Sequence, residues 1–386
     1  MLETCIHLLL QRVQIMKFTA TTKDLSQNLA LAARAVPSRP SHAILNNILV
    51  NADAKTNRVS FTGFDLAFGI VTSFEAEVSQ SGSIALPAKI FSDIAARLSD
   101  HEVTLEMVDG EESQVLLKCG RGKFTLSVTD GADFPHFPEV NGSKIELTAE
   151  VLLRGLRATL FAASTDETKQ ILQGVNISHD KEVLNFAGTD GHRLAVIEIP
   201  VENISDVAVT PPRRQLHELV ALLVRWGNDQ LVELELGEQV VNFRVGGNLL
   251  TTRTIDGDYP AYRQLMPKEF VNNTIVSRTD LLSVLGRVAV MADQKFQLVK
   301  FTFAVNELII SSQNAEVGQA SESFPAQHSG DSIVIGFNYK YLVDGLKSMT
   351  SEDVVIKSNS PLSPVIFVPM DGSKMWYLTM PIQLRD

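Results

Sequence analysis

Cysteine is scarce in this sequence, because Cys5 and Cys119 are the only two among 386 residues. They do not form a Cys-x-x-Cys pair, and two thiols cannot build a framework of paired cysteines. The sequence therefore supports neither a disulfide scaffold nor a cysteine zinc site, and it favours a reducing compartment.

Long apolar runs are also lacking. The run Ile6–Leu10 is too short to span a bilayer, and no basic segment or cleavage-like Ala-x-Ala motif accompanies it. We therefore expect no membrane partner. Met16-Lys17-Phe18 offers a second plausible start, so residues 1–15 are expected to form an N-terminal extension.

The sequence has none of the common catalytic motifs HExxH, helix-opening GxGxxG, Walker A or GxSxG, and its histidines lack metal-ligand spacing. One segment, TDGHRL, holds Asp190 close to His192, which is compatible with acid–base chemistry. A turn stabilised by the Asp190 side chain is the simpler interpretation. We predict no catalytic, cofactor-binding or metal-binding residue, and an enzyme is the weaker alternative.

Positive charge is in deficit, with 34 Lys and Arg against 45 Asp and Glu and a net charge of −11. The six segments with helical periodicity nevertheless carry twelve basic and six acidic residues. If these helices share one face, that face would attract phosphates while the remaining surface repels them. Lys and Arg are also good helix formers on solvated faces, so charge alone leaves nucleic-acid binding open.

What the sequence does contain is one pattern in three copies. Each copy opens with an amphipathic segment introduced by an acidic capping candidate, and these starts lie 126 and 130 residues apart: Asp24, Glu150 and Asp280. A β-rich stretch follows, beginning at Ile44, Ile171 and Gln297. A second amphipathic segment comes next, at 88–98, 212–226 and 339–349, and a second β-rich run closes each copy.

A period this long predicts self-standing domains and not the stacked units of a solenoid. Neighbouring strands joined by short turns favour antiparallel sheets with helices on one face, an α+β class. We predict an N-terminal extension and three such domains, bounded at 1–15, 16–142, 143–271 and 272–386.

The motifs resemble those of the bacterial β sliding clamps, the processivity subunits of DNA polymerase III. The resemblance runs in order from Met16 to Leu384. Its most specific landmarks are Thr-Asp-Gly-His-Arg-Leu-Ala-Val at 189–196 and the closing Tyr-Leu-Thr-Met-Pro-Ile-Gln-Leu at 377–384. Further landmarks are Asp-Phe-Pro at 133–135 and Asp-Tyr-Pro at 258–260.

The resemblance implies a head-to-tail homodimer, a ring of six similar domains with helices lining the hole and sheets outside. Such closure gives cyclic symmetry and removes exposed strand edges. By the resemblance, Phe124 meets Val290 and Met291 of the partner subunit, although all three could instead be ordinary core residues.

A closed ring needs only weak, sequence-independent contacts with double-stranded DNA, since topology retains it. The resemblance implies DNA contacts from five basic residues: Arg39, Lys89, Lys169, Arg213 and Arg214. An aromatic pair of the family is replaced here by Gln170 and Ile171, which puts base stacking at that place in doubt. The implied protein partners are the replicative polymerase, an ATP-dependent clamp loader and other clamp-motif proteins, in a cytoplasmic, nucleoid-associated setting.

The resemblance also implies a surface groove between the second and third domains that binds short peptides through Leu or Phe anchors. Its expected residues are Leu172, Thr189, Gly191, His192, Arg193, Leu194, Pro260, Leu265, Ser363, Met380, Pro381 and Ile382. His192 and Arg193 are expected to orient the peptide. Gln264 and Gln383 stand where basic residues are common, so partner preference could differ.

Three hypotheses follow. A clamp would encircle DNA without turnover, an enzyme would depend on His192, and a scaffold would bind peptides without regard to DNA topology. The repeats and motifs together favour the clamp.

Overall fold

The computed structural model describes residues 16–99, 102–108, 111–140, 142–180, 182–201, 207–237, 239–293 and 295–384. The predicted extension at 1–15 lies outside these residues. The described residues form two compact units. Unit 1 takes in the residues up to Lys144 together with Gln230–Arg253, and unit 2 takes in Ile145–Asp229 together with the residues from Thr254 onward.

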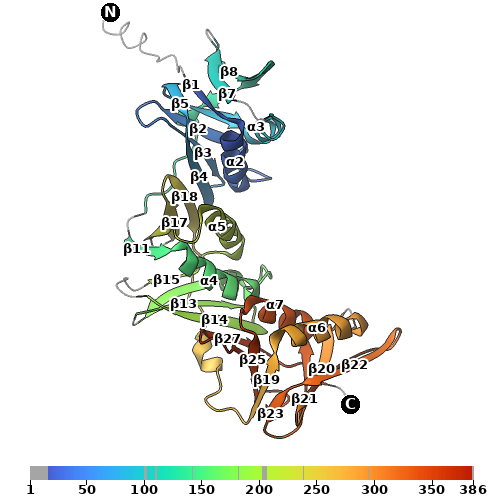
Figure 1. Cartoon of the computed structure of the whole chain (residues 1–386). Helices are drawn as coiled ribbons and strands as arrows, with labels where there is room; N and C mark the ends of the chain where they lie inside the picture. The colour runs from blue at the N-terminus through green and yellow to red at the C-terminus, as the bar shows by residue number, and fades with distance from the viewer. Residues whose placement is uncertain are drawn as a thin grey trace, which may run out of the picture. The chain divides into compact units, whose positions relative to one another are not determined.

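Unit 1 contains a five-stranded sheet and, apart from the residues of its last strand beyond Lys144, a nine-stranded sheet, and every strand pairing described in them is antiparallel. The smaller sheet has the order β5 (Glu77–Gln80), β1 (Lys17–Thr21), β7 (Glu102–Val108), β8 (Glu111–Cys119), β9 (Gly122–Ser127). The larger has the order β10 (Thr129–Asp130), β6 (Gly82–Pro87), β2 (Asn47–Asp53), β3 (Arg58–Phe64), β4 (Phe68–Glu75), β18 (Asn248–Arg253), β17 (Val240–Val245), β16 (Leu231–Leu236), β11 (Ser143–Thr148). Helices α2 (Thr22–Ala32) and α3 (Ala88–Ala95) pack against this sheet (Figure 1).

Unit 2 also contains two antiparallel sheets. The nine-stranded one has the order β15 (Val207–Val209), β12 (Asn176–Asp180), β13 (Val183–Thr189), β14 (Arg193–Pro200), β27 (Lys374–Thr379), β26 (Val365–Pro369), β25 (Asp353–Ser358), β19 (Asn272–Ser277), β23 (Gln327–Ser329). The four-stranded one has the order β22 (Gly318–Pro325), β21 (Glu307–Asn314), β20 (Leu298–Ala304), β24 (Ile333–Asn338).

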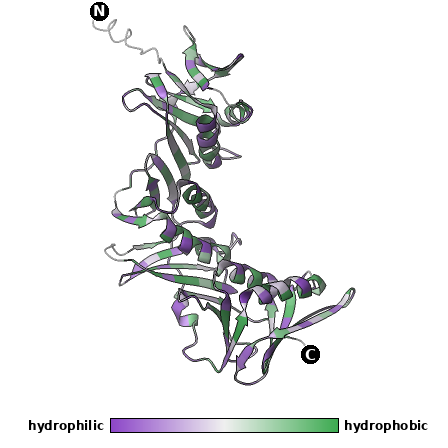
Figure 2. Cartoon of the chain, in the orientation of Figure 1, coloured by the Kyte–Doolittle hydropathy of each residue, from purple (hydrophilic) through white to green (hydrophobic). Residues whose placement is uncertain are grey.

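Four helices of unit 2 form a continuous row. They are α5 (Arg213–Trp226), α4 (Ala149–Thr159), α7 (Tyr339–Ser348) and α6 (Arg278–Val288), and each packs against the next in this order (Figure 1). Helix α4 buries Leu152, Leu153 and Leu156 while Arg154 and Arg157 stay exposed. Figure 2 shows this amphipathic character along the helices, whose apolar residues supply the core under the row.

The predicted helices are confirmed, but their caps differ from the prediction. The first helix of each repeat is capped by a hydroxyl that accepts a backbone N–H: Thr21 from Asp24 at 3.0 Å, Thr148 from Val151 at 3.4 Å and Ser277 from Asp280 at 3.2 Å. The acidic residues therefore lie in the first turn, where they favour the positive helix end, and are not the caps themselves.

Two of the predicted strand starts were also wrong. Ile44 and Ile171 belong to the 3-10 turns η2 (Ala43–Asn46) and η5 (Gln170–Gln173), and the strands begin after them, at Asn47 and Asn176. Short apolar runs do not distinguish a strand from a packed turn.

A close helix–strand contact recurs in the three copies. The backbone carbonyl of the last residue of α2, α4 and α6 faces Gly63, Gly188 and Ser312, respectively, on the neighbouring strand. At the two glycines a Cβ would lie 2.0 Å from the oxygen of Ala32 and 2.3 Å from that of Thr159, whereas the Ser312 hydroxyl donates to Val288 at 2.6 Å. The repeats therefore share packing as well as element order.

Candidate functional site

Most of the predicted groove residues lie at one end of four neighbouring strands in the nine-stranded sheet of unit 2. This end of the strands is called the groove edge of the sheet. Strand β13 ends at Thr189, β14 begins at Arg193, and β27 ends at Thr379, which pairs with both Arg193 and Val365. Ser363 lies two residues before the start of β26, and Met380 directly follows β27. Antiparallel pairing therefore places Thr189, the turn to Leu194, Ser363 and the segment Met380 to Ile382 at the same edge.

The turn at this edge is fixed by Asp190. Its Oδ1 accepts the backbone N–H groups of His192 at 2.9 Å and Arg193 at 3.0 Å. Thr189 Oγ1 donates to the carbonyl of Arg193 at 2.6 Å, and Gly191 adopts a φ of 90°, which favours glycine. The interpretation of Asp190 as a turn former is confirmed, since its carboxylate is occupied by these bonds.

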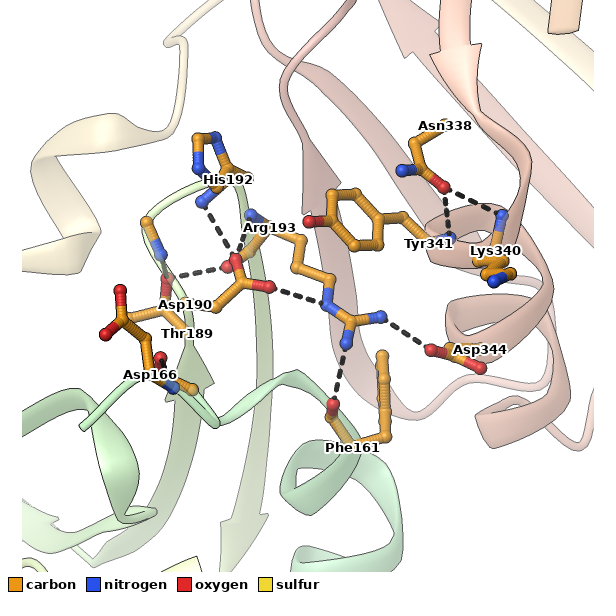
Figure 3. Close-up of polar contacts among 12 residues, drawn as sticks. Phe161, Asp166, Thr189, Asp190, His192, Arg193, Asn338, Lys340, Tyr341 and Asp344 are labelled. Atoms are coloured by element: carbon orange, nitrogen blue, oxygen red, sulfur yellow. Dashed lines mark hydrogen bonds and ion pairs between the residues drawn. The ribbon is translucent and has the colours of Figure 1, made fainter. Parts of the chain in front are cut away.

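The guanidinium of Arg193 points away from the turn and is surrounded by unit 2 (Figure 3). Nε donates to Asp190 Oδ2 at 3.1 Å, Nη1 to Asp344 Oδ2 at 2.7 Å, and Nη2 to the carbonyl of Phe161 at 3.0 Å. The Tyr341 ring stacks on it, with its centroid 4.5 Å from Cζ. The side chain is only 11% exposed, so little of its surface is open to a peptide.

An apolar cluster lies beneath this edge. Leu194 and Leu378, which pair across β14 and β27, pack with Tyr262, and Tyr259 packs against them. The predicted groove residues beside this cluster are more open to solvent: Pro260 is exposed, Leu265 is 54% exposed and Met380 is 39% exposed. An exposed apolar rim over a buried floor is the arrangement that accepts an apolar side chain of a ligand.

Hydrogen bonds hold the remaining groove segments in place. Met380 N–H donates to the carbonyl of His192 at 2.9 Å, and Ile382 N–H donates to that of Gly336 at 2.8 Å. Leu172 lies half-buried in η5, and Lys169, at the start of that turn, donates from Nζ to the carbonyl of Asp190 at 2.8 Å. Hydrogen bonds to backbone carbonyls therefore hold the segments on both sides of the groove in place.

The five basic residues predicted to contact DNA fall into two groups. Arg39, Lys89 and Arg214 are exposed, in the loop before η2, on α3 and on α5. Lys169 and Arg213 are half-buried beside the turn at Asp190.

The three residues predicted for the dimer interface lie at or near sheet edges. Phe124 is 37% exposed on β9, an edge strand of unit 1. Val290 is 76% exposed and Met291 is half-buried in η7 (Ala289–Met291), which packs near the edge strand β22 of unit 2. The exposure of Phe124 and Val290 excludes them from the core of the single chain.

Sequence reasoning missed Asp344, Tyr341 and Phe161 as partners of Arg193. Asp344 and Tyr341 share one face of α7 at a three-residue spacing, but that pattern is also common on solvated helices. Their role depends on a contact 151 residues away along the chain, which no local signal reveals.

Two further findings concern the described residues only. No helix within them combines the length and apolar character needed to cross a membrane. No group of His, Cys, Asp and Glu side chains among them could hold a metal ion.

Three family models match consecutive parts of the chain. They describe the N-terminal, central and C-terminal domains of the DNA polymerase III beta subunit and match residues 16–138, 146–261 and 263–383, respectively. The chain belongs to the beta sliding clamps, the beta subunits of DNA polymerase III. Its α+β fold of three clamp domains is therefore confirmed, and its function is that of a non-catalytic processivity factor.

The sequences and structures of known beta sliding clamps align with this chain over nearly its whole length. The beta sliding clamp of Synechocystis sp. is 43% identical and that of Escherichia coli K12 is 29% identical, each over 96% of this chain and 100% of the relative. Solved clamps from Pseudomonas aeruginosa, bound to griselimycin, and from Bacillus subtilis superpose with TM-scores of 0.90 at 28% identity, and each comparison covers 96% of this chain and 100% of theirs.

Proposed function

We propose that two copies of this chain close head to tail into a ring around duplex DNA and tether the replicative polymerase through the groove of unit 2. One observation carries this proposal: each of two open sheet edges has an exposed apolar residue on it or beside it, Phe124 on β9 and Val290 near β22. Neither edge strand has a second neighbour among the described residues, and exposed edges readily pair with another chain.

Charge at the two edges is complementary. Arg121 and Lys123 are exposed at β9, whereas Glu316 is exposed beside β22, and Glu322 on that strand is paired with Arg287 of its own chain. A β9 edge therefore suits the β22 edge of a second copy better than another β9 edge, which favours head-to-tail closure.

The row of helices in unit 2 supports contact with DNA. Arg154, Arg157 and Arg214 are exposed along it, while Arg39 and Lys89 are exposed in unit 1. Scattered cations without a base-reading motif bind phosphates weakly and independently of sequence. Such contacts let a closed ring slide along the duplex.

The groove supplies the tether. Its apolar rim and buried floor suit short motifs with Leu or Phe anchors, and Met380 can adapt to different ligands. A polymerase held this way stays at a high local concentration near the primer end. The same groove would serve an ATP-dependent clamp loader and other clamp-motif proteins in turn.

Primer extension on a long primed circle tests the tether. With polymerase, loader and ATP, and with excess primed template so that each polymerase acts once, the wild-type chain should give long products. Changing both Leu265 and Met380 to Ser removes the exposed apolar rim, so products should become short. Val305→Ser, at a position 75% exposed and away from the groove, is the matched control and should behave as wild type. Equal product lengths for all three proteins would contradict the groove assignment.

A further inference from the structure

A cavity of about 760 Å³ lies in unit 2, between α4 of the second repeat, α7 of the third repeat and the sheet that both helices cover (Figure 1). Ile197 of β14 and Met375 of β27, which pair with each other, line it. Side chains alternate along a strand, so these two point away from Leu194 and Leu378 of the apolar cluster beneath the groove. The cavity and that cluster therefore lie on opposite faces of the sheet.

The buried part of the cavity wall, here called the floor, is apolar. It includes Leu153, Ile197, Met349 and Met375, all of which are buried. The two flexible methionine side chains let the floor adjust to the shape of a ligand. An apolar body placed on this floor would leave water and bind by the hydrophobic effect, and the volume is that of a site for a small molecule.

The exposed part of the wall, here called the rim, carries three cations. Arg154 and Arg157 lie one turn apart on α4, and Lys347 lies on α7. Within the part of the chain that the structure describes, no hydrogen bond or ion pair engages any of the three. Their donors are therefore available to a ligand.

The carboxylates of the wall do not cancel these cations. Asp344 is paired with Arg193 at 2.7 Å. Asp371 accepts hydrogen bonds from two neutral residues of neighbouring turns, and Glu150 is exposed in the first turn of α4. Three unpaired cations therefore accompany two carboxylates that lack a basic partner among the described residues, and the balance of charge at the cavity is positive.

We propose that this cavity binds a small organic anion, with its apolar body on the floor and its acid group among the cations of the rim. The planar fork of arginine matches the oxygens of a carboxylate, sulfonate or phosphate. A phosphate of duplex DNA brings no apolar group that could reach the floor, so the floor favours a small molecule over the duplex. Because α4 and α7 belong to different repeats, a bound ligand would join the two repeats and stabilise unit 2.

A matched pair of probes tests the site. Anilinonaphthalene sulfonate supplies an apolar ring system with an acid group, and the corresponding sulfonamide has nearly the same shape without the charge. The full-length chain is labelled with carbon-13 at its methionine methyl groups, and NMR follows each resonance during titration. The sulfonate should move the resonances of Met349 and Met375, while Met380 reports separately on any binding in the groove.

The double variant Arg154→Gln, Arg157→Gln should bind the sulfonate in the cavity about five- to tenfold more weakly and should bind the sulfonamide as wild type does. High salt should weaken the sulfonate in the same way. The matched control is Arg214→Gln, Arg225→Gln, which removes two exposed charges of α5 outside the wall and should keep the wild-type affinity.

Three results would overturn the site. One is a sulfonate titration that leaves Met349 and Met375 unmoved. Another is an unchanged affinity for the sulfonate in Arg154→Gln, Arg157→Gln, or an equal loss for the sulfonamide. The third is a duplex oligonucleotide that moves the two floor resonances where the sulfonate does not, which would assign the cavity to the DNA backbone.

Discussion

At the residue scale, Arg193 connects three segments of unit 2. It bonds to the turn at Asp190, to Phe161 after α4 and to Asp344 on α7, and it is nearly buried. Only the planar fork of arginine can make these bonds together, since lysine offers a single charged centre. The position of the groove turn therefore depends on this guanidinium.

Arg193→Lys should lower the free energy of unfolding of unit 2 by about 2 kcal/mol, because bonds to charged groups are lost in a nearly buried place. Trp226 and Trp376, the two tryptophans, both lie in unit 2, so urea unfolding followed by tryptophan fluorescence reports on this unit. Arg263→Lys, whose side chain is 59% exposed, should change stability by less than about 1 kcal/mol. A similar loss in both variants would contradict the special role of Arg193.

In unit 1, Glu235 is a charged group that, like Arg193 in unit 2, is held by several hydrogen bonds and ion pairs. Burial raises the pKa of Glu235, but bonds from Lys144, Asn242 and Arg244 outweigh burial and hold that pKa at about 2. The ordinary value is 4.5, so the stabilisation is complete above that pH and is lost as the pH falls toward 2.

We expect this carboxylate to contribute on the order of 3 kcal/mol at neutral pH. Glu235→Gln should therefore be less stable than wild type at pH 7, and the difference should diminish from about pH 4.5 downward. Hydrogen exchange of the segment Leu231–Arg253, measured at several pH values, would show it. A difference that is independent of pH would contradict the assignment.

Residue identities in the site were predictable because the TDGHRL turn and the closing motif are specific sequence signals. The direction of the Arg193 side chain was not predictable from the sequence. Arg193 was expected to orient a ligand, yet Asp344 and Tyr341 hold it inside unit 2 through contacts distant in sequence. Long-range pairing of this kind leaves no local pattern.

At the element scale, the three copies share the contact between a helix end and a strand. Gly188→Ala would place a Cβ 2.3 Å from the carbonyl oxygen of Thr159, so α4 and β13 must move apart. We expect a loss of about 1–3 kcal/mol, as for other overpacked sites. Gly286→Ala on α6 meets no atom within 4 Å and should stabilise the helix by up to about 1 kcal/mol.

Both glycines lie in unit 2, so tryptophan fluorescence during urea unfolding compares them directly. Equal effects of the two substitutions would contradict the close helix–strand packing at Gly188.

Element types were largely predictable because each helix carries an apolar stripe and many strands alternate. The strand starts expected at Ile44 and Ile171 were wrong, because a 3-10 turn with two apolar residues has the same local pattern as the end of a strand. The sheet connections were hidden too. Strand β18 pairs with β4, so the sheet of unit 1 combines strands from two repeats.

At the scale of the whole molecule, the proposed closure into a ring would depend on the two open sheet edges, β9 and β22. Phe124→Asp replaces the exposed apolar side chain of β9 with a charged one, so the proposed dimer should dissociate at least about tenfold more readily. Sedimentation equilibrium measures this, with Ile90→Asp, 54% exposed on α3, as the control that should remain dimeric. An unchanged dimer in Phe124→Asp would contradict the proposed interface.

We propose that topology, and not affinity, holds the chain on DNA. The most direct measurement loads the purified protein onto nicked circular DNA with its loader and ATP, then compares retention before and after the circle is cut. A ring predicts that the protein stays on circles and runs off linear DNA. Equal retention on both forms, or none with an active loader, would contradict encirclement and leave the groove as the site of a peptide-binding scaffold.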